Sequence, residues 1–353
     1  MKSATLRSID ELCEHALVPR ERLGALSEVA ARYAVALTPA MADLIDRNDP
    51  NDPIARQFVP DARELEQQTQ ERADPIADNA FSPVEGLVHR YPDRVLLKIV
   101  NACAVYCRFC FRREMIGPGQ GGLSAAALAA ALHYIATHPQ VWEVILSGGD
   151  PLILSARRIK DVVQRLAAIA HVQVIRVHTR IPVVAPERIN ASLVRALRTD
   201  KATFVVLHAN HPRELTQQAR AACARLIDAG IPMLSQSVLL RGVNDDVETL
   251  GTLMRTFVAC RIKPYYLHHA DLAPGTAHLR TTIAEGQQLM RGLRGRFSGL
   301  CQPAYVLDIP DGHGKSPIGP NYVSTGDVSG GDAGATTLIE DYTGRRHAYP
   351  PKS

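Results

Sequence analysis

The sequence predicts an α/β protein whose centre is an incomplete (β/α)6 barrel. From about residue 95 the chain alternates short apolar runs with segments of helical pattern, the order expected of parallel strands joined by crossover helices. From the second run onward the runs begin about 30 residues apart, which is the length of one strand-helix unit. A full eight-unit barrel takes roughly 250 residues, whereas this periodic region spans about 180 residues, so six units fit. An open doubly wound sheet is the alternative, but no G-x-G-x-x-G motif follows the first run.

The same pattern divides the chain into three regions. Residues 1–88 are rich in Ala, Arg, Glu and Leu and indicate a helical N-terminal region. Residues 89–300 hold the partial barrel, and residues 301–353 form a C-terminal segment with a further strand, a Gly/Pro loop around Lys315 and a tail that is flexible by composition. The six barrel strands are expected at residues 95–100, 143–149, 174–180, 202–209, 232–240 and 262–269.

Composition argues against several classes of protein. With 353 residues and 46% hydrophobic content, the chain is able to bury a large core. Its 40 basic residues are scattered among 36 acidic ones, so no electrostatic footprint for nucleic acid stands out. No apolar run approaches the roughly 20 residues of a membrane span, and the N-terminus lacks the apolar core of a signal peptide. We therefore expect a cytoplasmic protein without nucleic-acid or membrane partners.

The seven cysteines indicate reduced thiols, because an odd number without a secretory signal argues against a disulfide framework. Cys13, Cys223 and Cys260 occur singly in expected helices, where a cysteine usually behaves as a small hydrophobic residue.

A C-x3-C-x2-C array follows the first barrel strand, where barrel loops build active sites. It consists of Cys103, Cys107 and Cys110. Three thiolates can hold zinc or an iron–sulfur cluster. A structural zinc site needs four ligands, and no fourth Cys or His lies nearby at a usual spacing. A 4Fe–4S cluster with one iron left open fits better, while zinc and purely structural cysteines are the alternatives.

The second barrel strand ends in the motif "SGGDPL" (147–152). Gly148 and Gly149 allow the backbone to approach a ligand closely, and Asp150 offers a carboxylate to a ligand ammonium; an ordinary strand-to-helix turn is the alternative. Together with the cysteine array, this motif resembles the signature of the radical S-adenosylmethionine superfamily. The resemblance implies a 4Fe–4S cluster that binds S-adenosylmethionine, with contacts from Ser147, Gly148, Gly149 and Asp150.

The loop around Lys315 suggests a second cofactor. Gly312, Gly314 and Pro317 set the backbone around this lysine, as a lysine that forms a Schiff base requires. An exposed loop lysine is the alternative.

An ordered series of motifs resembles the lysine 2,3-aminomutase family over residues 50–345. This family uses pyridoxal phosphate together with radical S-adenosylmethionine chemistry. Besides the cysteine array and "SGGDPL", the motifs are "HRYPDR" (89–94), "SQSVLLRGVND" (235–245), "YYLHHADLAPGTAHLR" (265–280) and "DIPDGHGKSPIGPNYV" (308–323).

The resemblance implies a role for each matching residue. The three cysteines match the cluster ligands, and Lys315 matches the lysine that binds pyridoxal phosphate. Arg112 matches the arginine that binds the substrate carboxylate, while Asp271 and Asp308 match the pair that takes the ε-ammonium of lysine. Arg113 has no match and is expected to be scaffold. The residues implied to hold pyridoxal phosphate are Arg90, Tyr91 and Arg94, and further contacts to S-adenosylmethionine are implied for His208 and Gln236.

The implied activity is an isomerisation that moves the 2-amino group of L-lysine to C3, giving β-lysine, with an electron donor such as flavodoxin or ferredoxin. Alternatives are a member of the branch that makes β-lysine for elongation factor P, a related 2,3-aminomutase acting on arginine or another amino acid, and a non-enzymatic metal-binding interaction protein. The short length resembles the elongation factor P branch, and so does His268, where long members tend to carry an aromatic residue. The motifs "DLAPG" (271–275) and "DIPDGHGK" (308–315) instead resemble the long members that act on free lysine, so the branch stays open. The chain lacks the zinc-binding C-terminal extension of the long members, so no zinc is expected and the question of a homo-oligomer stays open.

Overall fold

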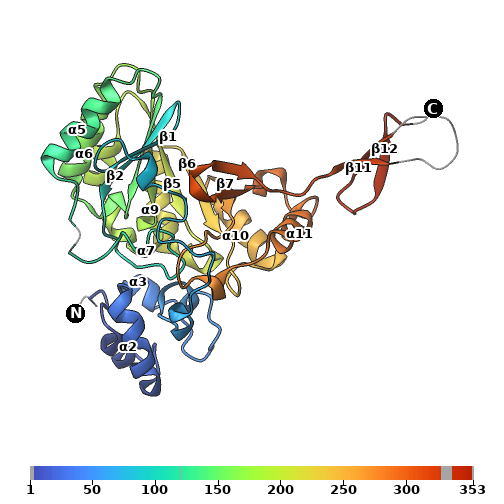
Figure 1. Cartoon of the computed structure of the whole chain (residues 1–353), viewed down its shortest axis with the longest axis horizontal. Helices are drawn as coiled ribbons and strands as arrows, with labels where there is room; N and C mark the ends of the chain where they lie inside the picture. Colours follow the sequence, from blue (N-terminus) through green and yellow to red (C-terminus); the bar gives the residue numbers. More distant parts are fainter. Residues whose placement is uncertain (1–3, 120, 327–335, 352–353) are drawn as a thin grey trace.

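A nine-stranded sheet, rolled up almost into a barrel, forms the centre of the computed structural model, which describes residues 4–119, 121–326 and 336–351 (Figure 1). Its strands are neighbours in the order in which they occur along the chain. They are β1 (Leu87–Tyr91), β2 (Arg94–Val100), β3 (Glu143–Gly148), β4 (Val174–Thr179), β5 (Ala202–His208), β6 (Met233–Val238), β7 (Ile262–His268), β8 (Ala304–Ile309) and β9 (Gly314–Pro317).

Strands β2 to β7 are the six parallel strands predicted from the sequence, and β8 pairs parallel to β7. Antiparallel β1 and β9 form the two edges. The two edges meet where the main-chain N–H of Lys315 donates to the hydroxyl of Tyr91 at 2.6 Å. The barrel prediction is therefore confirmed, and the sheet continues past residue 300, where the sequence predicted the barrel to end.

The structure corrects one local prediction. Lys315 was expected in a Gly/Pro loop, but it lies in strand β9. The reason is that residues 314–317 pair antiparallel with β8, which places Lys315 directly opposite Asp308.

Helices cover the outside of the sheet (Figure 1). They bury one apolar face each, as α6 does with Ile159, Val162, Val163 and Leu166 at helical spacing. The helices of the barrel are α5 (Ala125–Ala136), α6 (Ala156–Ala167), α7 (Ile181–Val184), α8 (Ala191–Leu197), α9 (Gln217–Asp228), α10 (Val247–Ala259) and α11 (Ile283–Leu293).

Polar N-caps set the starts of these helices, except that of α7, whose N-cap residue Arg180 makes no side-chain cap. The side chain of each cap accepts a hydrogen bond from a main-chain N–H of the first turn, which would otherwise lack a partner. The caps are Ser124, Ser155, Asn190, Thr216, Asp246 and Thr282.

The N-terminal region is helical, as predicted, and packs against the barrel. Its helices are α1 (Ile9–Glu14), α2 (Leu23–Arg32), α3 (Pro39–Ala42) and α4 (Ala55–Phe58), followed by short 3-10 turns, among them η2 (Ala62–Leu65). Buried side chains of this region, such as Leu26 and Phe58, belong to the same hydrophobic core as the barrel.

The C-terminal segment ends in a small antiparallel sheet that projects from the body (Figure 1). Its strands are β10 (Val323–Gly326), β11 (Thr336–Glu340) and β12 (Arg346–Tyr349). The tail that the sequence predicted to be flexible includes residues 327–335, which lie outside the described residues.

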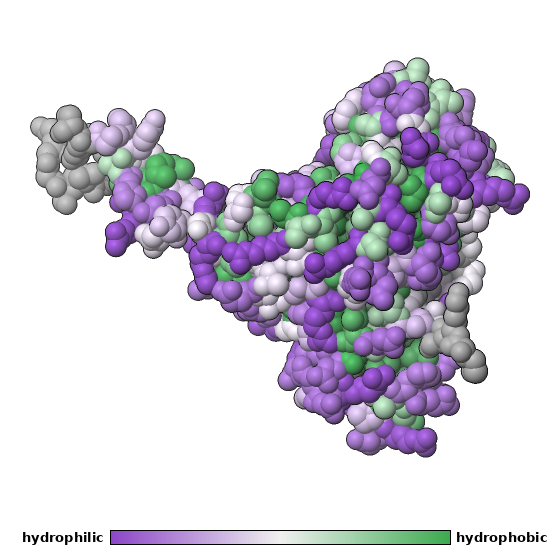
Figure 2. All heavy atoms as spheres, turned by 180° about the vertical axis from the view of Figure 1, so that it is seen from behind, coloured by the Kyte–Doolittle hydropathy of each residue, from purple (hydrophilic) through white to green (hydrophobic). Residues whose placement is uncertain are grey.

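The distribution of hydrophilic and hydrophobic side chains on the surface is typical of a globular protein. Figure 2 shows hydrophilic side chains over most of one face, with hydrophobic ones in small separate areas. In the described part of the chain, no helix combines the length and the apolar character needed to cross a membrane.

Candidate active site

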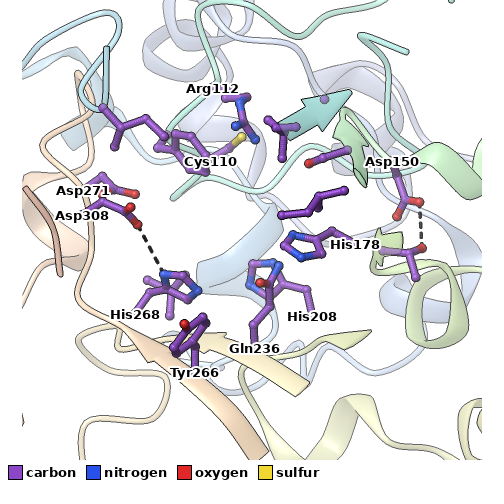
Figure 3. A pocket seen from close by; sticks show the side chains of 18 of the residues that line it. Cys110, Arg112, Asp150, His178, His208, Gln236, Tyr266, His268, Asp271 and Asp308 are labelled. Carbon is purple, nitrogen blue, oxygen red and sulfur yellow. Dashed lines mark hydrogen bonds and ion pairs between the residues drawn. The ribbon is translucent and has the colours of Figure 1, made fainter. Parts of the chain in front are cut away.

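A cavity of about 690 Å³ lies inside the barrel, and all the site residues predicted from the sequence line it. Side chains from every strand of the nine-stranded sheet or the turn that follows it reach this cavity. Figure 3 shows how they are distributed: Cys110 and Arg112 lie at one wall, Asp271 and Asp308 at a second, and His208 and Gln236 at a third. The structure thus brings the sequence motifs together in one place.

The cysteine loop connects β2 to the next crossover helix. Cys103, Cys107 and Cys110 all have free thiols that line the cavity, and the loop turns back on itself because Cys110 N–H donates to the carbonyl of Cys107 at 3.1 Å. Burial, the nearby Asp150 carboxylate and the other two thiols raise the pKa of Cys103 well above its usual value, and burial raises the pKa of Cys110 to about 11. Bare thiolates are therefore unfavourable here.

These thiols fit an iron–sulfur cluster. A bound cation removes the cost of three neighbouring buried thiolates, because a coordinating thiol is deprotonated outright. In residues 4–119, 121–326 and 336–351 no three Cys, His, Asp or Glu side chains are arranged to hold a single metal ion. A cluster does not require such an arrangement, since each thiolate binds a different iron atom.

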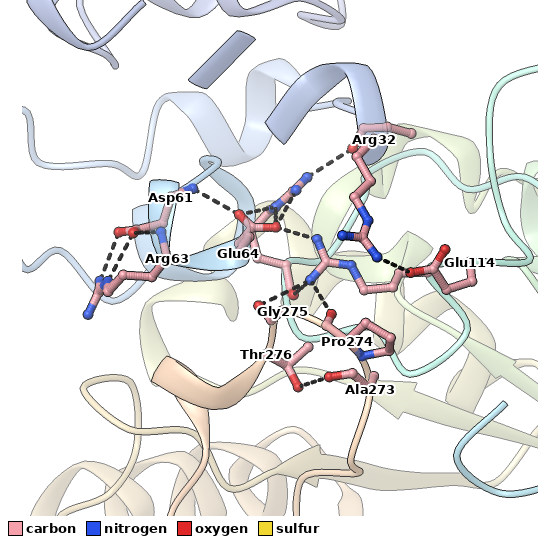
Figure 4. A network of polar contacts seen from close by, with 12 residues as sticks. Arg32, Asp61, Arg63, Glu64, Glu114, Ala273, Pro274, Gly275 and Thr276 are labelled. Atoms are coloured by element: carbon pink, nitrogen blue, oxygen red, sulfur yellow. Dashed lines mark hydrogen bonds and ion pairs between the residues drawn. The ribbon is translucent and has the colours of Figure 1, made fainter. Parts of the chain in front are cut away.

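A buried ionic network fastens the cysteine loop to the N-terminal region (Figure 4). Glu64 of η2 has no exposed surface, and its carboxylate accepts from Arg108 Nε at 2.9 Å and from the guanidinium of Arg113. Arg113 also donates to the carbonyls of Pro274, at 3.3 Å, and Arg108. These contacts agree with the prediction that Arg113 is scaffold.

The glycines of "SGGDPL" bring the end of β3 against the cysteine loop. A Cβ on Gly149 would lie 2.1 Å from the carbonyl oxygen of Ala102, and Gly148 has a positive φ of 104°. The main-chain N–H of Asp150 donates to that same carbonyl at 3.0 Å. The close approach predicted for these glycines is therefore, in this structure, an approach to the backbone just before Cys103.

The carboxylate of Asp150 is engaged in hydrogen bonds with other residues of the protein. It accepts from Thr179 Oγ1 at 2.7 Å, from Arg180 N–H at 2.7 Å and from Leu152 N–H at 3.0 Å. The side chain thereby joins the ends of β3 and β4 beside the cysteine loop. A contact with a ligand ammonium stays a prediction.

Four side chains form a cation-binding corner. The ammonium of Lys315 donates to Asp308 and lies 3.4 Å from His268 Nδ1, which is itself 3.7 Å from Asp308. Burial alone would raise the pKa of Asp308, but His268 and Lys315 hold it well below its usual range. In contrast, burial and the charge of Asp308 raise the pKa of Asp271 to about 7. Among the residues that the structure describes, Asp308 thus pairs with a cation and Asp271 does not.

Arg112 lies at a different wall of the cavity from Asp271 and Asp308 (Figure 3). Its Nε donates to Asp78 at 2.8 Å, and Asp78 also pairs with Arg90 at 3.2 Å. Burial alone would raise the pKa of Asp78, but Arg112, Lys98 and Arg90 outweigh burial and lower it, so Asp78 is ionised. Arg112 is therefore oriented by a carboxylate, and its terminal nitrogens have no hydrogen-bond partner within the described ranges.

The residues predicted to hold pyridoxal phosphate come from the β1–β2 hairpin. The guanidinium of Arg94 stacks on the ring of Tyr91, with Cζ 3.8 Å from the ring centroid. Tyr91 and Lys315 are in contact, as described above, whereas Arg90 is directed toward Asp78. Tyr91 therefore lies beside the lysine, Arg94 lies against Tyr91, and Arg90 is engaged in an ion pair with Asp78.

His208 and Gln236, predicted to contact S-adenosylmethionine, are register partners at the ends of β5 and β6. Burial and the charge of Arg180 lower the pKa of His208 well below its usual value. Its Nε2 is buried and lacks a hydrogen-bond partner among the described residues, so the cavity is lined here by a neutral ring with one unused nitrogen.

Sequence reasoning did not identify several residues of the site. They are Asp78, which orients Arg112, and Arg180, His178 and Tyr266, which line the cavity. His178 and Arg180 belong to the strand end "HTR" and could have been found by the rule used for the cysteines, because they too lie at the C-terminal end of a barrel strand. No sequence signal pointed to Asp78, which precedes the barrel.

Comparisons with known proteins agree with this geometry. Residues 97–253 match the model of the radical SAM superfamily. L-lysine 2,3-aminomutases of Clostridium subterminale and Acetoanaerobium sticklandii are 41% and 42% identical to this chain, over 90% of it and 76% and 77% of their own lengths. Glutamate 2,3-aminomutase of Clostridioides difficile is 33% identical over 91% of this chain and 76% of its own.

The family predicted from the motifs is thereby confirmed. The radical SAM match lies within the barrel. The identities of about 40% extend over 90% of this chain and about three quarters of each lysine aminomutase. The chain belongs to the lysine 2,3-aminomutase family of isomerases within the radical SAM superfamily.

Proposed function

We propose that this protein converts L-lysine to β-lysine by moving the amino group from C2 to C3. The observation that carries the proposal is that one cavity holds an arginine at one wall and two carboxylates at another. Lysine carries a carboxylate at one end and an ammonium at the other, so its two charges match these walls.

The chain's own residues bind and orient this substrate. Arg112, held by Asp78, offers its free nitrogens to the carboxylate, a planar pairing for which guanidinium is well suited. Asp308 and Asp271 bind the ε-ammonium. A cation between them removes the repulsion that raises the pKa of Asp271.

Two cofactors complete the proposed site. Cys103, Cys107 and Cys110 hold a 4Fe–4S cluster, with His208 and Gln236 beside the bound S-adenosylmethionine, and Lys315, Tyr91 and Arg94 hold pyridoxal phosphate. When bound, these groups would supply the radical that starts the reaction and a conjugated ring that stabilises radical character while the nitrogen moves from C2 to C3. The enclosing barrel excludes water from both. A low-potential flavodoxin or ferredoxin is the proposed electron donor.

The alternative substrates differ in charge. Glutamate, the substrate named for one relative, carries a second carboxylate, which the Asp271–Asp308 pair would repel. Arginine carries a cation at the same end as lysine but is longer, so it is the closer competitor.

The deciding experiment is anaerobic incubation of the purified protein with S-adenosylmethionine, pyridoxal phosphate, dithionite and a panel of amino acids, followed by chromatography of the β-amino acids formed. We expect β-lysine as the main product. Turnover of arginine or glutamate without turnover of lysine would replace the proposal.

A matched pair of variants tests the cofactor assignment. Lys315→Ala should abolish the visible absorption band of protein-bound pyridoxal, while Lys263→Ala should keep it, because Lys263 is exposed and donates only to the carbonyl of Leu300. A band retained in Lys315→Ala would contradict the role of Lys315.

A further inference from the structure

Arg180 contacts one of the three thiols of the cysteine array. Its Nη1 donates to Cys107 Sγ at 3.0 Å. The arginine side chain is only 7% exposed and lies against the rings of Phe58 and Phe109, with Cζ 4.8 and 5.5 Å from their centroids. Within residues 4–119, 121–326 and 336–351, Cys107 is the one thiol of the array that receives a hydrogen bond from a side chain.

The other end of the guanidinium is held in place. Nη2 donates to Gln57 Oε1 at 3.0 Å and to the carboxylate of Glu214, which has no exposed surface. Glu214 also accepts from the main-chain N–H groups of Asn210, at 2.8 Å, and His211, at 2.9 Å. With both Gln57 and Glu214 fixed, the guanidinium cannot turn its Nη1 away from Cys107.

The backbone of Arg180 is tied to the cysteine loop as well. Its N–H donates to Asp150, and the N–H of Asp150 donates to the carbonyl of Ala102, next to Cys103. The position of Arg180 relative to the thiols is therefore set through main-chain contacts at one end and through a buried carboxylate at the other.

A fixed cation with an N–H directed at a thiolate sulfur stabilises negative charge on that sulfur. Reduction of an iron–sulfur cluster adds one electron, and part of that charge resides on the sulfurs. Hydrogen bonds to the sulfurs therefore favour the reduced form and raise the reduction potential.

We propose that Arg180 is a positioning residue that raises the reduction potential of the 4Fe–4S cluster through its hydrogen bond to Cys107. The proposal rests on the proposed function, because it requires that the three thiols hold the cluster. It assigns to Arg180 the task of making the cluster reducible by a low-potential one-electron donor.

The test uses Arg180→Gln, which removes the charge, and Arg180→Lys, which keeps the charge but not the fork of donors. The control is Arg225→Gln, since Arg225 is exposed and its guanidinium donates to the carbonyls of Ile189 and Pro186, away from the thiols. Each protein is reconstituted anaerobically, its iron and sulfide per chain are measured, and the cluster is titrated with dithionite while the reduced form is followed by electron paramagnetic resonance.

We expect a shift to lower potential in Arg180→Gln. At the potential where half of the wild-type cluster is reduced, the ratio of reduced to oxidised cluster should fall roughly tenfold, the factor for one lost hydrogen bond to a charged group. The ratio for Arg180→Lys should lie between those of the wild type and Arg180→Gln. The ratio for Arg225→Gln should equal that of the wild type.

The proposal would be overturned if Arg180→Gln had a normal content of iron and sulfide and the same ratio of reduced to oxidised cluster as the wild type. Loss of the cluster in both Arg180 variants would also overturn it, because Arg180 would then be needed for assembly and not for potential. Wild-type protein that binds no iron would overturn the proposed function itself, which separates the two failures.

Discussion

Lys315 donates a hydrogen bond from its side-chain ammonium to Asp308, the residue directly opposite it in the β8–β9 pair. The register of two edge strands therefore sets an ion pair inside the cavity. A slip by one residue would turn Lys315 to the other face of the sheet. The Lys315 ammonium occupies, beside Asp308, the position proposed for the ε-ammonium of the substrate, so the two cations compete for this carboxylate.

Asp308→Ala should weaken lysine binding selectively. We expect KM for lysine to rise roughly tenfold to a hundredfold, as for a lost hydrogen bond between charged groups, while iron content stays normal. The control is Asp311→Ala, because Asp311 lies nearby in the chain but its side chain is 59% exposed and, within the described residues, pairs with Arg72 alone. Unchanged lysine kinetics in Asp308→Ala would contradict the cation site.

Lysine binding should depend on pH through Asp271. Burial and the charge of Asp308 raise its pKa to about 7, so below that pH the carboxyl is neutral and must lose a proton to bind a cation. We expect kcat/KM for lysine to rise by roughly tenfold per pH unit up to about pH 7 and then to level off. Measured pH profiles of the wild type and Asp271→Asn test this. A variant that kept the wild-type slope would assign the titration to another group.

Asp78→Asn should impair the carboxylate end of the site. Without the charge on Asp78, the Nε contact that orients Arg112 is weakened, and we expect KM for lysine to rise about tenfold. Steady-state kinetics beside Asp161→Asn provide the comparison, since Asp161 pairs with exposed arginines on α6. Equal KM values in the two variants would mean that Arg112 does not depend on Asp78.

Glu64→Gln should destabilise the protein. The substitution leaves two buried guanidinium groups, those of Arg108 and Arg113, without a carboxylate, and breaking a buried ion pair in this way costs about 3–5 kcal/mol. Thermal unfolding followed by circular dichroism should show a clearly lower midpoint. Glu248→Gln is the control, because that carboxylate is 71% exposed and surface pairs contribute about 0–1 kcal/mol. Similar midpoints for both variants would contradict the role of the network.

The barrel could be predicted because its strands repeat. The starts expected at residues 95, 143, 174, 202, 232 and 262 differ from those of β2 to β7 by at most one residue. The position of the site could then be predicted from the geometry of parallel strands, since polar residues at their C-terminal ends meet at one rim of the barrel. The cysteine array and Lys315 were found because glycines, cysteines and a lysine at special spacings are informative even in one sequence.

The partners of these residues could not be predicted. Asp78 and Arg112 are 34 residues apart, and Arg180 and Cys107 are 73 residues apart. Nothing local in the sequence distinguishes such an aspartate or arginine from one on the surface. The strand β9 was missed for a related reason, because a four-residue glycine-containing segment becomes a strand only through its pairing with β8.

The buried carboxylate of Glu64 also bears on the order in which the molecule folds. Its cationic partners Arg108 and Arg113 come 44 and 49 residues later in the chain, and Arg113 needs the carbonyl of Pro274, a further 161 residues on. A growing chain therefore completes the contacts of Arg113 only after Pro274 has been synthesised. Contacts of such sequence separation form slowly, so the part of the protein that is made first is among the last to reach its native structure.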